Sequence, residues 1–333
     1  MPAVQSPAKV LVTGANGFLA LHIVTQLLAQ DYSVRGTVRT ASKGEWLKNH
    51  FSKFADRFEY IVVSDITKEG AFDEAIQGAD AVLHTAAPFP DGFAGTYESI
   101  YVPSVHGAQS IFKSLLGSTT VKRVVFTSSF VAMMEPHDPG YTWSETDWND
   151  NASKLVKGSP HELSGYMLYL AAKTDAERVA WDFYHNHQKE VQWDLVTLMM
   201  PYIFGPALQE ESNFSTNVIY RKAFEERPKD QVGKHAGLWS DVRDVSRAHV
   251  LSLQKQQAGG ERIFIAGGAF VWQDVYKALQ TLNNPEIPRP VEDSDVYDIA
   301  DTAKAARILG LDYHTFGESV RDTLEAMQER RVQ

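Results

Sequence analysis

The sequence predicts an α/β protein with a Rossmann-type, doubly wound parallel sheet and a smaller C-terminal lobe. Short β-branched runs alternate with longer segments of helical spacing over about the first 200 residues. The strand-like runs are apolar at successive positions, as expected where helices cover both faces of a sheet. A glycine-rich turn follows the first run, where a dinucleotide-binding fold holds the pyrophosphate.

Six runs are expected to form strands of this sheet, and helical spacing fills the segments between them. No repeat of 20–50 residues is visible. The expected strands are Lys9–Thr13, Ser33–Val38, Phe58–Val63, Ala81–Thr85, Arg123–Thr127 and Asp194–Leu198, and the clearest helices are Ala20–Gln30, Tyr97–Leu116 and Tyr166–Tyr184.

The alternation changes after Pro201, where Phe204–Pro206 interrupts the chain. We assign residues 1–200 to a dinucleotide-binding domain, with a strand near 262–266 added to it, and residues 201–333 mostly to a substrate-binding lobe. The later segments are expected to be a helix outside the sheet, one more strand, a connector and a terminal helix, at Asn213–Phe224, Arg262–Ala266, Asn284–Pro290 and Phe316–Arg330.

The charge and the residue content exclude several classes of protein. The formal net charge is −10 and no block of Lys and Arg interrupts it, so nucleic acid is not an expected partner. The absence of cysteine excludes disulfides, thiolate catalysis and zinc held by thiolates. No run approaches the roughly 20 apolar residues of a membrane span, and Met1–Lys9 is too short and polar for a signal peptide. We expect a cytoplasmic protein without a membrane partner.

Two other kinds of catalytic site lack their motifs. His185 and His187 stand two apart on a predicted helix and face different sides, so no metal site is expected there. The sequence has no Gly-x-Ser-x-Gly elbow, which is the nucleophile turn of many acyl-transfer enzymes.

The glycine-rich turn is Thr13–Ala20, which leads from the first strand into a helical segment. Glycine lets the backbone turn sharply and approach a pyrophosphate, which the amides at the helix N-terminus then bind. The spacing is G-x-x-G-x-x-A rather than G-x-G-x-x-G, and glycine is common wherever a turn starts a helix. Its place directly after the first strand favours dinucleotide binding.

The end of the second strand distinguishes NAD from NADP. An NAD site needs an acidic residue there for the ribose hydroxyls. Here Arg39 follows the strand, and Lys43 comes four residues later. Two cations suit a 2′-phosphate, although a solvated surface pair has the same appearance in sequence. Because the glycine turn specifies this position, we predict NADP(H).

Tyr169 and Lys173 are candidates for acid–base chemistry. They stand four apart in a predicted helix, so their side chains share one face. A lysine cation favours the phenolate and lowers the tyrosine pKa from near 10, so the phenol can donate a proton to a developing alkoxide. Tyr169 is the only one of 13 tyrosines with this spacing, although roughly 0.7 such pairs are expected by chance. Its place after the fifth strand favours a catalytic role over a surface pair.

The third candidate is a serine at the end of the fifth strand. Ligands of open parallel sheets bind at the carboxyl ends of the strands, and Ser128 and Ser129 follow Thr127 there. A hydroxyl at this point can bind a substrate carbonyl oxygen and orient it towards Tyr169. Chemistry alone does not choose between the two serines, and a serine ending a strand is often a helix cap.

Together these residues resemble the extended short-chain dehydrogenases/reductases, in the dihydroflavonol-reductase-like branch with the fungal aldehyde, methylglyoxal and carbonyl reductases. The resemblance covers nearly the whole chain and implies NADPH-dependent reduction of aldehyde or ketone carbonyls to alcohols. We expect a small-molecule carbonyl substrate and a monomer or homodimer. The matching motifs are Val12–Phe18, Arg35–Arg39, His84–Pro88, Thr127–Ser129, Tyr169–Lys173, Phe204–Pro206 and Asp241–Val245.

The resemblance also implies roles for individual residues. It makes Ser129 the catalytic serine, Tyr169 the acid and base, and Lys173 its electrostatic partner, and it gives Asp241–Val245 a structural role between the lobes. Besides Tyr169 and Lys173, the implied cofactor-binding residues are Gly14, Asn16, Gly17, Phe18 and Leu19 at the pyrophosphate, Arg39 and Lys43 at the 2′-phosphate, Asp65 and Ile66 at the adenine, and Thr85, Ala86, Ala87, Thr127, Pro201, Ile203 and Ser215.

One segment departs from the family pattern. Many extended members carry Asn-Val-x-Gly on the fourth helix, where the Asn supports a proton relay, whereas Pro103–Gly107 reads PSVHG. The relay beyond Lys173 is therefore unassigned.

Two other functions stay open. A sugar-nucleotide epimerase or dehydratase of the same fold would usually carry an acid after the second strand, and a non-catalytic NADP sensor would need neither Tyr169 nor Lys173.

The substrate pocket is predicted to be aromatic. Apolar walls around a few polar groups are typical of small-molecule sites. Phe89 and Phe130 follow strand ends that face the cleft, whereas core packing is an equal alternative for Met133 and Trp239. The predicted pocket residues are Phe89, Phe130, Met133, Tyr166, Phe204 and Trp239.

Overall fold

A seven-stranded parallel sheet forms the centre of the computed structural model, which describes residues 3–88, 93–209, 225, 227–228, 231, 233–280, 287–290 and 298–331. The strand order is β10-β7-β5-β4-β1-β2-β3, and all neighbouring strands run parallel. This sheet confirms the predicted fold class. Its strands are β1 (Lys9–Thr13), β2 (Ser33–Val38), β3 (Phe58–Val62), β4 (Ala81–His84), β5 (Arg123–Thr127), β7 (Asp194–Met199) and β10 (Arg262–Phe264).

Burial on both faces explains why the strands are continuously apolar. Val10 and Val12 of β1 pack into one core cluster, and Leu11 between them packs into the other. Such alternation follows from the period of two along a strand. The order of strands reverses between β1 and β4, and ligands of such sheets bind outside the carboxyl ends of the strands at this switch point.

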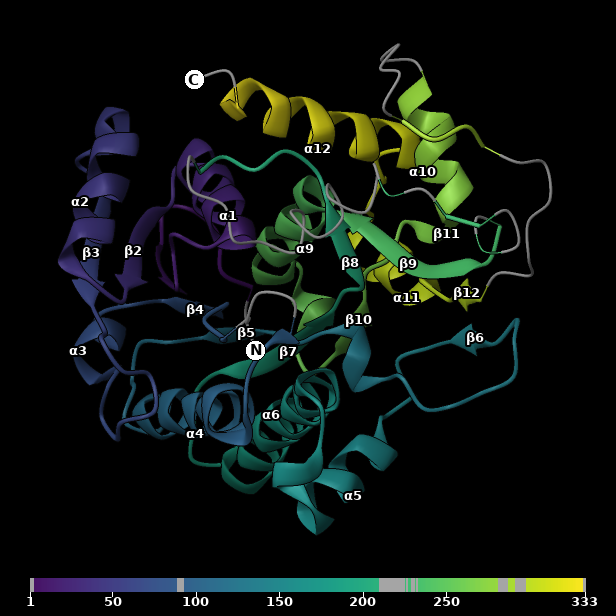
Figure 1. The fold of residues 1–333 in the computed structure, drawn as a ribbon. Helices are drawn as coiled ribbons and strands as arrows, with labels where there is room; N and C mark the ends of the chain where they lie inside the picture. The colour runs from purple at the N-terminus through teal and green to yellow at the C-terminus, as the bar shows by residue number, and fades with distance from the viewer. Residues whose placement is uncertain are drawn as a thin grey trace.

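Helices cover both faces of the sheet (Figure 1). On one face α1 (Phe18–Ala29), α9 (Val242–Gln254) and α11 (Ala303–Leu309) contribute to the first cluster. On the other face α4 (Val102–Leu116) and α6 (Gly165–His187) contribute to the second. The remaining elements of this part are α2 (Ala41–His50), α3 (Asp73–Ile76), α5 (Asp150–Gly158), and the short helices η1 (Ser52–Phe54), η4 (Phe130–Ala132), η5 (Pro160–Glu162) and η6 (Gln256–Ala258).

A second, smaller part of the molecule has its own sheet and its own core. Its sheet has the order β11-β9-β8, with β8 and β9 parallel and β9 and β11 antiparallel. Phe204, Trp239 and Phe270 form this core together with α10 and α12. Its elements are β8 (Tyr202–Phe204), β9 (His235–Asp241), β11 (Gly268–Val271), α10 (Trp272–Leu279) and α12 (Phe316–Arg331), and a separate parallel pair joins β6 (Thr142–Trp143) to β12 (Ile299–Ala300).

The chain beyond residue 200 contributes to both parts. The strand expected near 262–266 is β10, which pairs with β7 at the edge of the main sheet. Helix α9 likewise returns to pack beside α1. The domain boundary at residue 200 therefore stays a prediction. In the structure, segments after residue 200 belong to both parts, since β10 and α9 pack with the main sheet.

Two helical predictions have different outcomes. The single helix expected over Tyr97–Leu116 is divided into a π-helical turn, η3 (Tyr97–Tyr101), and α4, with Pro103 in the first turn of α4. Proline is tolerated there because the first amides of a helix have no partner within it. The helix expected at Asn213–Phe224 and the first part of the expected connector, residues 284–286, lie outside the described residues. None of the helices described is both long and apolar enough to span a membrane.

Candidate active site

The glycine turn brings the end of β1 close to the end of β4. Gly14 has a φ of +66°, and a Cβ there would lie 3.2 Å from the Cα of Ala86. Only glycine meets both conditions without strain. The amide of Gly17 donates to the carbonyl of Gly14 over 2.9 Å, which closes the turn. This cradle is the close backbone approach that a pyrophosphate needs.

Helix α1 begins immediately after the turn, and no side chain of its first turn would compete with a bound phosphate for the free backbone amides. Gly17 is the N-cap residue and supplies no capping side chain, and no acidic residue occupies the first turn. Phe18 and Leu19 pack with Ile203 at the start of β8. The positive end of α1 is thus built to bind an anion. The buried Gln209 also contacts the glycine turn: its side-chain amide donates to the carbonyl oxygens of Asn16 and Gly17 over 3.1 and 2.8 Å.

Arg39 follows β2 directly, and Lys43 lies in the first turn of α2. Arg39 and Lys43 are exposed, and neither makes an ion pair with another described residue. Asp65 lies nearby: hydrogen bonds from Thr67 lower the pKa of its carboxyl, and the charge of Arg39 lowers it further. Ile66 packs over Gly107 of α4, where a Cβ would lie 2.9 Å from its Cδ1 atom. Arg39 and Asp65, predicted for the 2′-phosphate and the adenine, are therefore close enough for their charges to interact.

A buried histidine organises the end of β4. Thr13 Oγ1 accepts hydrogen bonds from the amides of Thr85 and Ala86, each over 3.0 Å. Its proton is then donated to His84 Nδ1, 3.0 Å away. Burial lowers the pKa of His84 to about 3, so the ring is neutral with its proton on Nε2. Thr127 contacts a second buried histidine, because its hydroxyl lies 2.9 Å from His249 Nε2 on α9.

The two serines after β5 have different partners. Ser128 Oγ donates to the carboxylate of Glu177 over 2.5 Å, and both residues are buried. Ser129 instead forms a side-chain hydrogen bond with the phenol of Tyr169. Successive side chains of an extended strand point to opposite sides, and Ser129 is extended, with φ −156° and ψ 152°. Of the two serines, only Ser129 is placed beside the candidate acid.

Tyr169 and Lys173 lie one turn apart on α6, as the spacing predicted. Burial raises the pKa of Tyr169 to about 12, while its hydrogen bond with Ser129 acts in the opposite direction. Burial lowers the pKa of Lys173 to about 8, and the charge of Glu177 opposes this shift. The tyrosine is therefore a neutral proton donor at pH 7, and the lysine is a cation that burial has made easier to deprotonate.

The predicted pocket residues are mostly buried. Phe130 stacks on Phe264 with ring centroids 5.5 Å apart, and Phe204 and Trp239 lie in the core of the small sheet. Met133 is also fully buried. Their packing is that of core residues, so their contact with substrate stays a prediction, and Phe89 and Ser215 lie outside the described residues.

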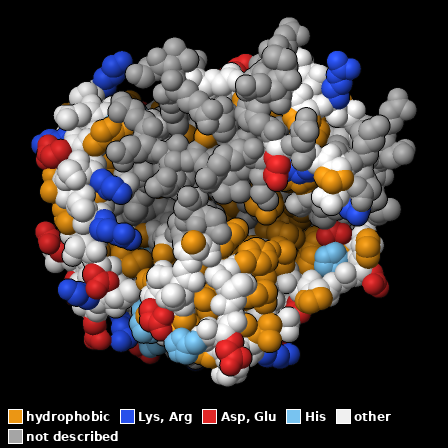
Figure 2. Space-filling view, in the orientation of Figure 1, with side chains coloured by type: hydrophobic (Ala, Val, Ile, Leu, Met, Phe, Trp, Pro, Cys, Tyr) orange, Lys and Arg blue, Asp and Glu red, His pale blue; other side chains and the backbone are white. Residues whose placement is uncertain are grey.

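Tyr166 differs from these residues because 39% of its surface is exposed. Phe93 contacts the rings of both Tyr166 and Tyr169, with centroids 5.2 Å apart in each case. Tyr202 is similarly exposed and is close enough to Tyr169 to influence its pKa. Figure 2 shows apolar side chains gathered in a hollow on this face, over the region where Figure 1 places β10.

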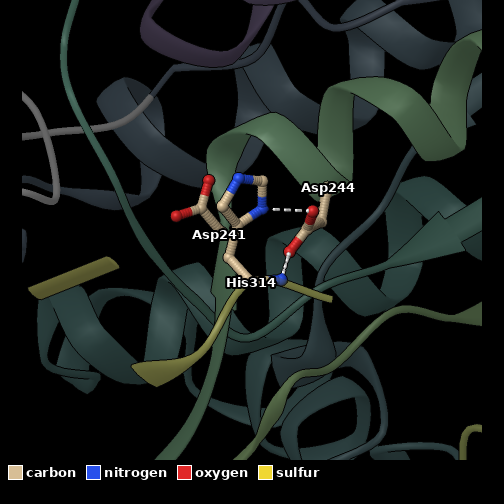
Figure 3. A group of neighbouring side chains, drawn as sticks. All are labelled: Asp241, Asp244 and His314. Atoms are coloured by element: carbon tan, nitrogen blue, oxygen red, sulfur yellow. Dashed lines mark hydrogen bonds and ion pairs between the residues drawn. The ribbon is translucent and has the colours of Figure 1, made fainter. Parts of the chain in front are cut away.

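A group of three potential ligands lies where α9 begins (Figure 3). Asp244 accepts from the amide of His314 over 2.9 Å, and its other oxygen lies 2.7 Å from His314 Nδ1. Both oxygens of Asp241 accept from Arg243, and one also accepts from Ser319 of α12. All four carboxylate oxygens thus have protein donors. The group joins α9 to α12 without needing an ion.

Three polar residues of this region were not predicted. His84 lies within a motif that the sequence singled out, so its position was visible but its tautomer was not. Gln209 and Glu177 carry no motif, because each acts through partners distant in sequence.

Comparison with known proteins identifies the family of this chain. A model of the NAD dependent epimerase/dehydratase family matches residues 10–267. The chain is 33% identical to a ketoreductase of Aspergillus niger, over 97% of this chain and 98% of the relative. It is 31% identical to an NADPH-dependent methylglyoxal reductase of Saccharomyces cerevisiae, over 95% and 96% of the two chains.

A solved structure is similar over the same extent. The yeast methylglyoxal/isovaleraldehyde reductase complexed with NADPH has a TM-score of 0.86 and 28% identity, over 97% of this chain and 99% of that chain. The family match includes the glycine turn, both serines, Tyr169 and Lys173. The chain therefore belongs to the NAD dependent epimerase/dehydratase family, the extended short-chain dehydrogenases/reductases that its motifs predicted.

Proposed function

We propose that this protein reduces aldehyde and ketone carbonyls to alcohols with NADPH. The observation that carries the proposal is the hydrogen bond between Ser129 and Tyr169 at the carboxyl end of β5, with Lys173 one helical turn away. A hydroxyl that binds a carbonyl and a phenol that protonates it are the polar groups that such a reduction needs.

NADP(H) is the cofactor that the chain's own residues fit. The cradle at Gly14 and the uncapped start of α1 suit the pyrophosphate. Arg39 and Lys43 suit the 2′-phosphate, and no acid follows β2 to select NAD. When bound, the reduced nicotinamide supplies the hydride that the carbonyl carbon takes up. The fungal relatives named as NADPH-dependent support this choice.

Three side chains share the remaining chemistry. Ser129 Oγ donates a hydrogen bond to the carbonyl oxygen and holds it beside Tyr169. Tyr169 Oη gives its proton to that oxygen as negative charge develops there. Lys173 keeps a cation one turn away, which favours the phenolate that remains. In alcohol oxidation the same groups act in reverse.

The alternatives are less well supported. A sugar-nucleotide epimerase of this fold usually carries an acid after the second strand, where this chain has Arg39. The similarity to a solved NAD-bound epimerase is at 18% identity and concerns the fold alone. A non-catalytic NADP sensor would not need Tyr169 buried against Ser129.

The test is an assay of NADPH oxidation over aldehydes, vicinal diketones, β-keto esters and flavanonols, with the alcohol product identified. We expect turnover with at least one class, and at least tenfold higher kcat/KM with NADPH than with NADH. NADPH binding without turnover on any class would favour the sensor. Equal kcat/KM for both cofactors would contradict the role of Arg39 and Lys43.

A further inference from the structure

A buried carboxylate on α6, outside the catalytic trio, connects three strands of the main sheet. Glu177 is fully buried. It accepts from Ser128 Oγ over 2.5 Å, from Thr197 Oγ1 over 2.9 Å and from Arg262 Nε over 2.7 Å. These partners belong to the end of β5, to β7 and to β10, which are neighbours in the sheet. One side chain thus fixes three strands relative to α6.

Arg262 is itself held in place. Its Nη1 donates to the carbonyl oxygens of Glu145 and Asp147, each over 2.7 Å. The ring of Trp148 lies under the guanidinium, 3.7 Å from its Cζ atom. The carboxylate and the guanidinium are buried together, so each compensates the charge of the other. Glu177 is therefore a fixed hydrogen-bond acceptor with a fixed partner of opposite charge.

Glu177 is connected to the proposed catalytic residues Ser129, Tyr169 and Lys173 in two ways. The first is Ser128, which donates its proton to Glu177 and precedes Ser129 on an extended segment. The second is α6, where Tyr169, Lys173 and Glu177 follow one another at intervals of four residues and so lie on one stripe of the helix. The charge of Glu177 favours the cationic form of Lys173.

We propose that Glu177 is a positioning residue for the reduction and acts together with Arg262. By holding Ser128 it directs Ser129 towards Tyr169, and it keeps a negative charge one helical turn from Lys173. The proposal rests on the proposed function, since it assigns the supporting contacts of the same site. It also explains why the chain uses the second of two adjacent serines.

The experiment is the substitution Glu177→Gln, which keeps the size of the side chain and removes its charge. We expect kcat to fall at least tenfold while the Kd for NADPH, measured by fluorescence titration, changes less than twofold. Rates are expressed per NADPH-binding site, so that loss of folded protein does not count as loss of catalysis.

The pH profile gives a readout that a purely structural role would not move. Among the described residues, the titratable groups that act on or beside Lys173 are Tyr169 and Glu177 on α6 and His84 on β4. Lys173 acts as a cation, so kcat falls as the pH rises through its pKa, which is about 8 in the native chain. Removing the charge of Glu177 lowers this pKa, so the falling limb moves to lower pH, by roughly one unit.

The matched control is Asp194→Asn, which also leaves a buried arginine, Arg123, without its carboxylate, but at the amino ends of β5 and β7. It should leave kcat per NADPH site and the pH limb unchanged. If Glu177→Gln does not fold, Glu177→Gln/Arg262→Met removes both charges and is measured in the same way.

Two outcomes overturn the proposal. One is a Glu177 variant with native kcat and an unmoved pH limb, and the other is an equal loss of kcat in Asp194→Asn. Failure of the proposed function looks different, because the native protein would then bind NADPH without turning over any class of carbonyl, whatever the Glu177 variants do.

Discussion

The main sheet holds two buried arginine–carboxylate pairs with different surroundings: Arg123 of β5 with Asp194 of β7, and Arg262 of β10 with Glu177 of α6. Near the amino ends, Arg123 donates to both oxygens of Asp194 over 2.7 and 2.8 Å. Its Nη1 also donates to the carbonyl oxygens of Ser252 and Lys255, at the end of α9. In the second pair Arg262 also donates to backbone carbonyl oxygens, but Glu177 accepts from hydroxyl groups, including that of Ser128 at the carboxyl end of β5.

The difference concerns what each pair holds in place. Helix ends leave carbonyl groups without partners, and Arg123 supplies donors to those of α9. That pair secures a helix against the sheet. One hydroxyl group bound by Glu177 belongs to Ser128, which precedes the proposed catalytic serine. On our proposal, similar ion pairs of one sheet serve stability at one end and catalysis at the other.

The largest expected effect is on the free energy of unfolding, and it tests the pair at the amino ends of β5 and β7. Asp194→Asn leaves the buried Arg123 without its charge partner, which should lower the free energy of unfolding by ~3–5 kcal/mol. Urea unfolding measures this change, and kcat per NADPH site should stay within twofold. A large loss of kcat in the protein that remains folded would contradict the separation of the two ends.

The next effect belongs to the carboxyl end. Tyr169→Phe removes the proton donor without changing packing, so kcat should fall at least a hundredfold, which is about 2.7 kcal/mol of transition-state stabilisation. NADPH binding and the free energy of unfolding should stay close to native values. Turnover within tenfold of native would show that Tyr169 is not the acid.

A comparison of the two serines sharpens the contrast within the carboxyl end itself. Ser129→Ala should lower kcat roughly 30- to 100-fold, because the carbonyl oxygen loses a hydrogen bond as its charge develops. Ser128→Ala should cost about 1 kcal/mol of stability, from the lost bond to Glu177, and only a few-fold in kcat. The reverse order in kcat would mean that Ser128 is the catalytic serine.

The last effect, at Arg39, is expected away from both pairs and concerns the cofactor rather than the reaction. Arg39→Ala removes a charge-assisted contact to the 2′-phosphate worth ~1.5–3 kcal/mol, so kcat/KM with NADPH should fall about tenfold or more. Steady-state kinetics with NADH serve as the control, since NADH has no 2′-phosphate and its kcat/KM should hardly change. A similar loss with both cofactors would place Arg39 outside the phosphate site.

Local rules made much of the molecule predictable from its sequence. The six strands of the first 200 residues follow from apolar runs, and Tyr169 and Lys173 share a face because a helix repeats every 3.6 residues. Gly14 was identifiable because a turn between strand and helix needs its positive φ. The prediction of NADP(H) was also local, because it rests on Arg39 standing directly after β2 where an NAD site would carry an acid.

The tertiary structure alone decided how these pieces are supported. Ser128 and Ser129 are equivalent in sequence, and they differ because Glu177 lies 49 residues from Ser128 along the chain and is held by Arg262, a further 85 residues on. The amide of Gln209 reaches the glycine turn across 192 residues. Phe204 and Trp239 lie in or beside motifs predicted to face the nicotinamide, yet they pack into the core of the small sheet. A sequence specifies local periodicity and turn geometry directly, but hydrogen-bond partners and burial depend on which distant segments the folded sheet brings together.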